Sequence, residues 1–142
     1  MNIASVLASK GSGVITISAE QSVGQAVGAL AQRNIGALVV VDAAGRPVGI
    51  ISERDVVRAA AHDPQVLARA VGTIMTRDVI IGLPQDDLVS VGHTMTERRI
   101  RHLPVMEEGR LVGIVSIGDI VKAQRDQYEG ELETLHTQIS GA

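Results

Sequence analysis

The sequence predicts a mixed α/β (α+β) fold in which one strand-helix-strand-strand-helix unit occurs twice. The first observation is an internal repeat: residues 45–57 return as residues 109–121, with Gly, Arg, Val, Gly, Ile, Ser, Asp and Val at matching positions. The second is the alternation, in both halves, of short β-branched runs with segments whose apolar residues recur at helical spacing. The third is a hydrophobic content of 45% in 142 residues, enough for a sizeable core. Because an internal repeat defines the structural unit, both halves are expected to share one topology.

The chain begins with a predicted helix over residues 1–13, whose apolar residues share one face and which Gly11 can end. Residues 14–18 are apolar and β-branched, which predicts a strand. Ser22 is a suitable N-cap for the following helix, which should end near Asn34.

The hairpin of the first unit is predicted from two apolar runs. Residues 37–41 are too few for a helix and indicate a strand buried on both faces, joined by a turn to a strand over residues 48–51. Ser52 then starts a helix that completes the first unit, residues 14–62. Residues 63–75 begin with Asp-Pro, an N-cap followed by Pro at the first helical position, and predict a connecting helix.

The second unit, residues 76–122, repeats this order. Its expected elements are a strand at residues 79–81, a helix from Asp86, strands at residues 102–106 and 111–115, and a helix from Ser116. The offset between the halves changes from sixty-five to sixty-four at the hairpin, so the second hairpin turn should be one residue shorter.

A helical extension is predicted for residues 123–142. Its apolar residues Tyr128, Leu132, Leu135 and Ile139 recur at spacings of four, three and four, as in a coiled-coil seam. Two interpretations are compatible with this seam: a helix folded back on its own domain, and a helix that dimerises or binds a partner.

Composition excludes several classes of function. A net charge of -3 and a single aromatic residue argue against nucleic-acid binding. The chain has no cysteine, and its four histidines are too scattered to suggest a metal site. Neither a signal peptide nor a membrane-spanning apolar run is visible, so no membrane partner and a cytoplasmic location are expected.

Each copy of the repeated stretch carries a Ser and an Asp three residues apart where a buried strand leads into a helix: Ser52 with Asp55, and Ser116 with Asp119. One interpretation is structural, because a Ser N-cap with an acidic residue at N3 is a capping box that also suits the helix dipole. The shared context favours more than a cap, since a Gly and two aliphatic residues precede the Ser in both halves.

That motif of Gly, two aliphatic residues, Ser, two variable residues and Asp resembles the signature of cystathionine-β-synthase (CBS) domains. The resemblance covers about residues 14–122 and identifies the chain as a tandem pair, or Bateman module, like stand-alone CBS-domain signalling proteins. It implies two β-α-β-β-α repeats related by a pseudo-two-fold axis, with clefts that receive AMP, ADP, ATP, NAD or S-adenosylmethionine. It also implies that Asp55 and Asp119 bind ribose hydroxyls, with Ser52 and Ser116 beside them.

The chemistry of these residues agrees with that implication. A carboxylate can accept two hydrogen bonds from a cis-diol, and a helix N-terminus offers N–H donors and positive potential to a phosphate. Similar proteins place the base against the strands, so Thr16, Ala37 and Leu38 are the adenine candidates. Gly118 replaces the bulkier Arg54 of the first motif, so the two clefts should differ in shape and charge.

Phosphate-binding candidates lie where the second half adds cations between helix and strand. Arg101 and His102 are favoured, with Arg54 as a helper, because the guanidinium fork fits phosphate oxygens and related pairs use basic residues at this junction. Solvated surface charge explains the same cluster, and His102 alone could be a satisfied core histidine. Lys10 and Thr76 could also reach phosphate, although a helix C-terminal charge and a turn residue explain them equally well.

The function expected from the sequence is a non-catalytic regulatory module that binds an adenine nucleotide and acts in trans on an unidentified effector protein, with the chain forming a homodimer. The alternative is a ligand-independent dimerisation or scaffold protein whose Ser-Asp pairs only cap helices. An enzyme is disfavoured because no P-loop, nucleophile elbow, dinucleotide fingerprint or histidine-metal spacing occurs.

Overall fold

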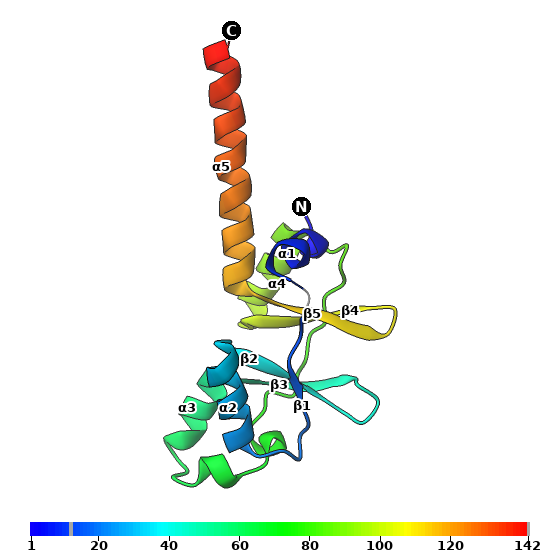
Figure 1. The fold of residues 1–142 in the computed structure, drawn as a ribbon, viewed down its shortest axis with the longest axis vertical. Helices are drawn as coiled ribbons and strands as arrows, with labels where there is room; N and C mark the ends of the chain where they lie inside the picture. Colours follow the sequence, from blue (N-terminus) through cyan, green and yellow to red (C-terminus); the bar gives the residue numbers. More distant parts are fainter. Residues whose placement is uncertain (12, 142) are drawn as a thin grey trace.

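The body of the protein consists of two similar halves, one above the other (Figure 1). The computed structural model describes residues 1–11 and 13–141, with side chains described as far as His136. The first half contains β1 (Thr16–Ile17), α2 (Val23–Arg33), β2 (Ala37–Val41), β3 (Pro47–Ser52) and α3 (Glu53–Ala60). Its sheet has the order β1-β2-β3, with β1 parallel and β3 antiparallel to β2.

The second half contains α4 (Leu88–Arg98), the antiparallel pair β4 (His102–Glu107) and β5 (Arg110–Ser116), and α5 (Ile117–Gly141). The prediction of a strand at residues 79–81 is wrong, since these residues form no ladder and only the following residue, Gly82, makes a single parallel bridge, to Val105. The reason is Pro104, which stands where the first half has Val39. Val39 donates its N–H to the Ile15 carbonyl, and proline has no N–H to donate.

The helices begin where side-chain caps predict. Ser22 and Gln25 form a capping box at α2, as Ser52 and Asp55 do at α3, and Asp87 accepts the Ser90 N–H at the start of α4. These bonds satisfy backbone donors that have no partner within the helix. Each half therefore builds its helices from local signals that the sequence already shows.

The two hairpins differ as expected. β2 and β3 are joined by a turn that ends at Gly45 with φ 80°, whereas β4 and β5 are joined by Glu108 and Gly109, both at positive φ. Two consecutive residues at positive φ are typical of the two-residue hairpin turn. The second turn is shorter, which explains the change in offset between the halves.

The connector between the halves is not the single helix predicted for residues 63–75. It forms two short 3-10 turns, η1 (Val66–Ala68) and η2 (Val71–Thr73). Ala70 is extended between them, and the Val71 N–H donates to the Gln21 carbonyl at 2.8 Å rather than to its own helix. Backbone pairing with a neighbouring segment has replaced helical hydrogen bonds here.

Each half is completed by the segment that leads into the other half. Residues 69–72 pair with residues 19–23 of the first half: the Val23 N–H donates to Arg69 O, and the Gly72 N–H to Ala19 O. The N-terminal segment makes matching contacts with the second half, with the Leu88 N–H donating to Met1 O and the Ala4 N–H to Pro84 O. Val23 and Ala19 of the first half correspond to Leu88 and Pro84 of the second, at the offset of sixty-five. The pseudo-symmetry of the two halves therefore includes the N-terminal segment.

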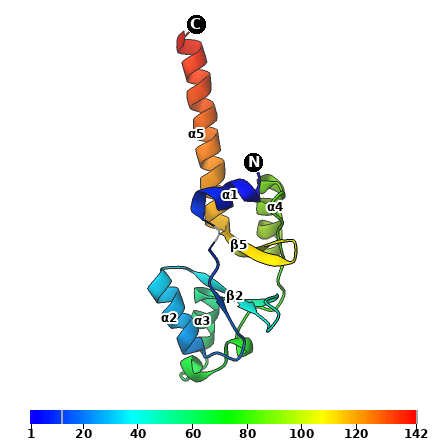
Figure 2. The same cartoon turned by 45° about the vertical axis from the view of Figure 1, so that its right-hand side comes forward.

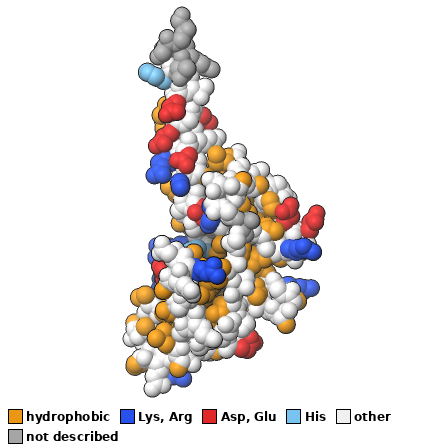
Figure 3. All heavy atoms as spheres, viewed as in Figure 1, with side chains coloured by type: hydrophobic (Ala, Val, Ile, Leu, Met, Phe, Trp, Pro, Cys, Tyr) orange, Lys and Arg blue, Asp and Glu red, His pale blue; other side chains and the backbone are white. Residues whose placement is uncertain are grey.

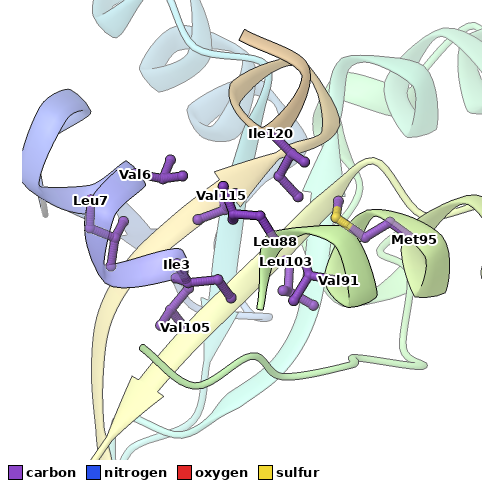
Figure 4. Packing of buried hydrophobic residues seen from close by; sticks show 10 residues of the cluster. All are labelled: Ile3, Val6, Leu7, Leu88, Val91, Met95, Leu103, Val105, Val115 and Ile120. Atoms are coloured by element: carbon purple, nitrogen blue, oxygen red, sulfur yellow. The ribbon is translucent and has the colours of Figure 1, made fainter. Parts of the chain in front are cut away.

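Two aliphatic cores result, one in each half. The second core is formed by α1 (Ile3–Lys10) together with α4, β4, β5 and α5, and Figure 4 shows the side chains of Ile3, Leu7 and Leu88 converging there. Burying an aliphatic side chain of this size contributes about 1.5–3 kcal/mol. The N-terminal helix therefore supplies a substantial part of the second core.

The last helix, α5, leaves the body as a single rod and does not fold back on it (Figures 1 and 2). Three side chains of the predicted seam are exposed: Tyr128 by 62%, Leu132 by 48% and Leu135 by 54%. The side chain of Ile139, the fourth member, lies outside the described residues. Within the part of the chain that the structure describes, no helix has the length and hydropathy to cross a membrane.

Gly49, the first residue of the repeated Gly-aliphatic-aliphatic-Ser motif, permits a close crossing of two backbones. A Cβ at this position would lie 2.9 Å from Thr76 O and 2.6 Å from the Met75 sulfur. We expect Gly49→Ala to lower the free energy of unfolding by about 1–3 kcal/mol, because the backbones must separate.

Gly28 provides the matched control, since a Cβ there would meet no atom within 4 Å. Gly28→Ala in the α2 interior should be neutral or stabilise the chain by about 0.5–1 kcal/mol. Urea denaturation of the two variants beside the parent checks both values. Equal stability of Gly49→Ala and the parent would contradict the tight crossing.

Candidate functional site

A cavity of about 350 Å³ lies between the two halves. Its walls come from β3 and the start of α3 in the first half, from the segment that enters the second half at Thr76, and from the junction between α4 and β4. Polar residues, which we call the floor, and apolar residues, which we call the wall, both line this cavity, and its volume suits a small-molecule ligand.

The polar floor is centred on Asp55. One carboxylate oxygen of Asp55 accepts the Ser52 backbone N–H at 2.9 Å, and the other accepts the Thr76 hydroxyl at 3.2 Å. The Ser52 hydroxyl in turn accepts the Asp55 backbone N–H at 3.3 Å. The capping box expected from the sequence is thus present, and its carboxylate also faces the cavity.

Four arginines line the same cavity: Arg54, Arg58, Arg99 and Arg101. All four are exposed, and among the described residues none has a carboxylate oxygen within 4.0 Å of its guanidinium. Lys and Arg side chains gather on the face drawn in Figure 3 at the waist between the halves. These unpaired cations, together with the N-terminus of α3, favour an anionic group in the cavity.

The apolar wall consists of aliphatic side chains from three segments. Ile50 of β3, Val79 and Ile80 of the segment that follows Thr76, and Ile100 before β4 all line the cavity. This wall can cover the flat face of a heterocyclic base, and the backbone of the extended segment offers polar groups to its edge.

His102 lies at the margin of the cavity with its ring against Gly36, where a Cβ would stand 3.6 Å from His102 Nε2. Burial lowers the pKa of His102 below its ordinary 6.5, and the charge of Lys10 lowers it further, with a partial opposing effect from Asp119. The lowered pKa favours the neutral form of the imidazole over the cation.

Asp119, the counterpart of Asp55, has a different environment. Lys10 Nζ contacts its carboxylate at 2.5 Å and also donates to the Ile114 carbonyl at 2.9 Å. Burial raises the pKa of Asp119, but the hydrogen bonds from Lys10 and from the Ser116 N–H outweigh burial, so that the pKa lies below its ordinary value. Asp119 lines neither the cavity described above nor a second cavity of about 420 Å³ beside α4.

The structure brings together the predicted ribose and phosphate candidates of one cleft: Ser52, Asp55, Arg54, Arg101 and His102. Arg101 and His102, the basic residues of the second half, thus line the same cavity as Asp55.

The adenine candidates lie outside this cavity. Thr16 is exposed on β1, and Ala37 and Leu38 are buried in β2, where Leu38 belongs to the first core. Their role in binding adenine therefore stays a prediction.

Sequence reasoning missed Arg58 and Arg99 and gave Thr76 little weight. A signal for Arg58 was available, because it follows Asp55 by three residues and therefore shares its helix face. Arg99 carried no such signal. It ends α4 at φ 56°, a left-handed conformation that an arginine rarely adopts, and only the fold shows where its side chain lies.

Comparison with known proteins identifies the repeat. The family model "CBS domain" matches residues 9–62 and again residues 71–126. The Arabidopsis thaliana protein named "CBS domain-containing protein CBSX3, mitochondrial" is 34% identical over 98% of this chain and 72% of its own length. The Bacillus subtilis CBS domain-containing protein YhcV is 30% identical over 78% of this chain and 79% of its own length.

Solved structures show the same fold. The CBS-domain containing protein ATU1752 from Agrobacterium tumefaciens superposes with a TM-score of 0.83 at 41% identity, covering 87% of this chain and 99% of that one. The CBS domain pair of protein MJ0100 superposes with a TM-score of 0.80 at 29% identity, covering 89% and 98%. The latter structure is a complex with 5′-methylthioadenosine and S-adenosyl-L-methionine.

Proposed function

This chain belongs to the CBS domain family and carries a tandem pair, one domain in each half, and on that premise we propose that it is a non-catalytic regulatory module for an adenosine-containing ligand. The observation that carries the proposal is the position of Asp55, at the start of α3 and on the floor of a cavity of about 350 Å³ that four arginines also line.

Ribose and phosphate find complementary groups at this helix start. The Asp55 carboxylate can accept hydrogen bonds from both ribose hydroxyls, with the ligand taking the place of the Thr76 hydroxyl. The arginines and the N-terminus of α3 supply positive potential a few atoms away, where a 5′-phosphate would extend. AMP, ADP, ATP and NAD therefore fit the charge of the cleft better than a ligand without phosphate.

The related complex of MJ0100 supports the ligand class, since both of its ligands contain adenosine. Neither carries a phosphate, whereas the cavity of this chain is lined by Arg54, Arg58, Arg99 and Arg101. The phosphorylated ligand is thus a property that we assign to this chain from its own residues.

The signal is proposed to act in trans through a homodimer or an effector protein, in the cytoplasm. The exposed side chains of α5 supply a surface for such contact. A ligand-independent scaffold is the second candidate, and the complete capping boxes support it, because they give Ser52 and Asp55 a role without any ligand.

A thermal-shift titration separates these two candidates. A ligand at a hundred times its dissociation constant stabilises the folded chain by about 2.7 kcal/mol. AMP, ADP, ATP, NAD and S-adenosylmethionine should be compared, and the absence of any shift would favour the scaffold.

Asp55→Asn should lower affinity for the nucleotide about tenfold to a hundredfold, because a charged acceptor of two hydroxyls is lost. Asparagine keeps the size of the side chain and an oxygen that can accept the Ser52 N–H, so the fold should persist. Isothermal titration calorimetry measures the loss. Asp119→Asn, at the matching helix start, is the control and should leave this affinity unchanged; full affinity in Asp55→Asn would refute the ribose assignment.

Arg101→Ala should reduce affinity for ATP about tenfold and leave adenosine almost unaffected, because its guanidinium meets phosphate only. Arg110→Ala is the charge-matched control, since Arg110 is exposed on the β4–β5 hairpin, away from the cavity. A parallel loss for ATP and adenosine would contradict the phosphate role.

The combined change Leu132→Ala and Leu135→Ala should weaken self-association if α5 pairs with a second copy, because both side chains belong to the exposed seam. Sedimentation velocity over a range of concentrations measures the change. Leu67→Ala is the control, at 54% exposure like Leu135 but on η1. Identical sedimentation of the parent and the double variant would contradict self-association through the seam.

A further inference from the structure

We call the region around Asp119, which matches the Asp55 cavity in the other half, the Asp119 cleft, and there a side chain of the chain itself lies at the carboxylate. Lys10 Nζ bonds both the Asp119 carboxylate, at 2.5 Å, and the Ile114 carbonyl, at 2.9 Å. Lys10 and Asp119 are only 35% and 25% exposed, so the ion pair is partly shielded from solvent. The charge of the Asp119 carboxylate, the group that would accept ribose hydroxyls, is thus neutralised by Lys10 of the same chain.

The Lys10 ammonium contacts the counterparts of the groups that Thr76 contacts in the other cleft, while Gly11 is the residue that matches Thr76 in sequence. Thr76 exchanges two backbone hydrogen bonds with Ile50, at 2.8 and 2.9 Å, and its hydroxyl donates to Asp55 at 3.2 Å. Lys10 contacts Ile114 and Asp119, which are the counterparts of Ile50 and Asp55. One cleft therefore has a short neutral hydroxyl at its carboxylate and the other has a long ammonium.

We propose that Lys10 closes the Asp119 cleft to ribose, so that the chain takes a single adenosine-containing ligand, in the Asp55 cleft. A ribose hydroxyl can replace another hydroxyl as a donor to a carboxylate with little change in charge. Replacing an ammonium leaves both the amine and the carboxylate without their ionic partner. Lys10 is accordingly a residue that determines specificity and stoichiometry.

The position of Lys10 is fixed by the helix that carries it. Ile3, Val6 and Leu7 of α1 are buried in the second core, and Leu7 fills the space where a Cβ on Gly113 would stand. Lys10 is the last residue of α1, so the ammonium is held at the cleft by a packed helix rather than by a loose terminus.

The charge around Asp119 points the same way. Of the four arginines of the Asp55 cleft, three have counterparts without a charged side chain and one has a charged counterpart: Arg101 corresponds to Gly36, Arg99 to Asn34, Arg54 to Gly118 and Arg58 to Lys122. A phosphorylated ligand therefore meets fewer cations there than in the Asp55 cleft, which leaves less to compensate for the loss of the Lys10 ion pair.

Lys10→Thr replaces the long ammonium by a short neutral hydroxyl side chain and is the direct test. The inference rests on the proposed function, so the full chain is titrated with AMP and, separately, with 5′-methylthioadenosine, and sites per chain are counted by equilibrium dialysis at saturation. The parent should bind one ligand per chain and Lys10→Thr two. The double variant Lys10→Thr, Asp119→Asn should return to one, which assigns the new site to Asp119.

Thr76→Lys tests the idea in reverse, since a lysine at this position should reach Asp55 and abolish binding to the parent's site. Thr76→Ala is its control and should keep the site, because it adds no ammonium. Thermal melts of each variant confirm that the chain is folded.

The outcomes separate this inference from the proposed function. Two ligands per chain in the parent, or one in Lys10→Thr, would overturn the role of Lys10 and leave the nucleotide module standing. If neither the parent nor any folded variant binds AMP or 5′-methylthioadenosine, the proposed function and this inference are both overturned.

Discussion

The backbone crossing between the two halves is the constraint on which the site depends. Thr76 pairs with Ile50 through two hydrogen bonds, and this approach is possible because Gly49 has no Cβ. The crossing places a residue that enters the second half beside the helix start of the first. Without this crossing, Asp55 would lie on an open surface. With it, Asp55 lies in a cleft lined by residues of both halves.

The same constraint explains why two copies of one motif need not do one job. Each helix start is completed by a residue from the segment leading into the other half, and these segments do not resemble each other in sequence. One delivers the hydroxyl of Thr76 and the other the ammonium of Lys10. Identical Ser-Asp pairs thus acquire different electrostatic surroundings from residues that lie outside the repeated stretch.

Structural and ligand-binding roles coincide at the start of α3. Ser52 and Asp55 satisfy each other's backbone N–H groups, which any helix start requires. The carboxylate performs this task with one oxygen, while the other faces Thr76 and the cavity. Capping a helix and accepting ribose hydroxyls therefore do not exclude each other. Whether such a carboxylate can also bind ribose depends on whether the space beside it is open.

The sequence by itself determined the repeated unit, the capped helices, the two hairpins and the Ser-Asp pairs, because these follow from local spacing, turn residues and side-chain caps. It did not determine the connector over residues 63–75 or the strand at residues 79–81, where pairing with distant segments and the missing N–H of Pro104 outweigh local preference. Only the tertiary structure decided that Arg99 joins Arg101 at the Asp55 cleft and that Lys10 fills the other. The physical reason is that the segment preceding each half packs against the other half. This packing sets which side chains meet across a cleft, and it cannot be predicted from the periodicity of the sequence.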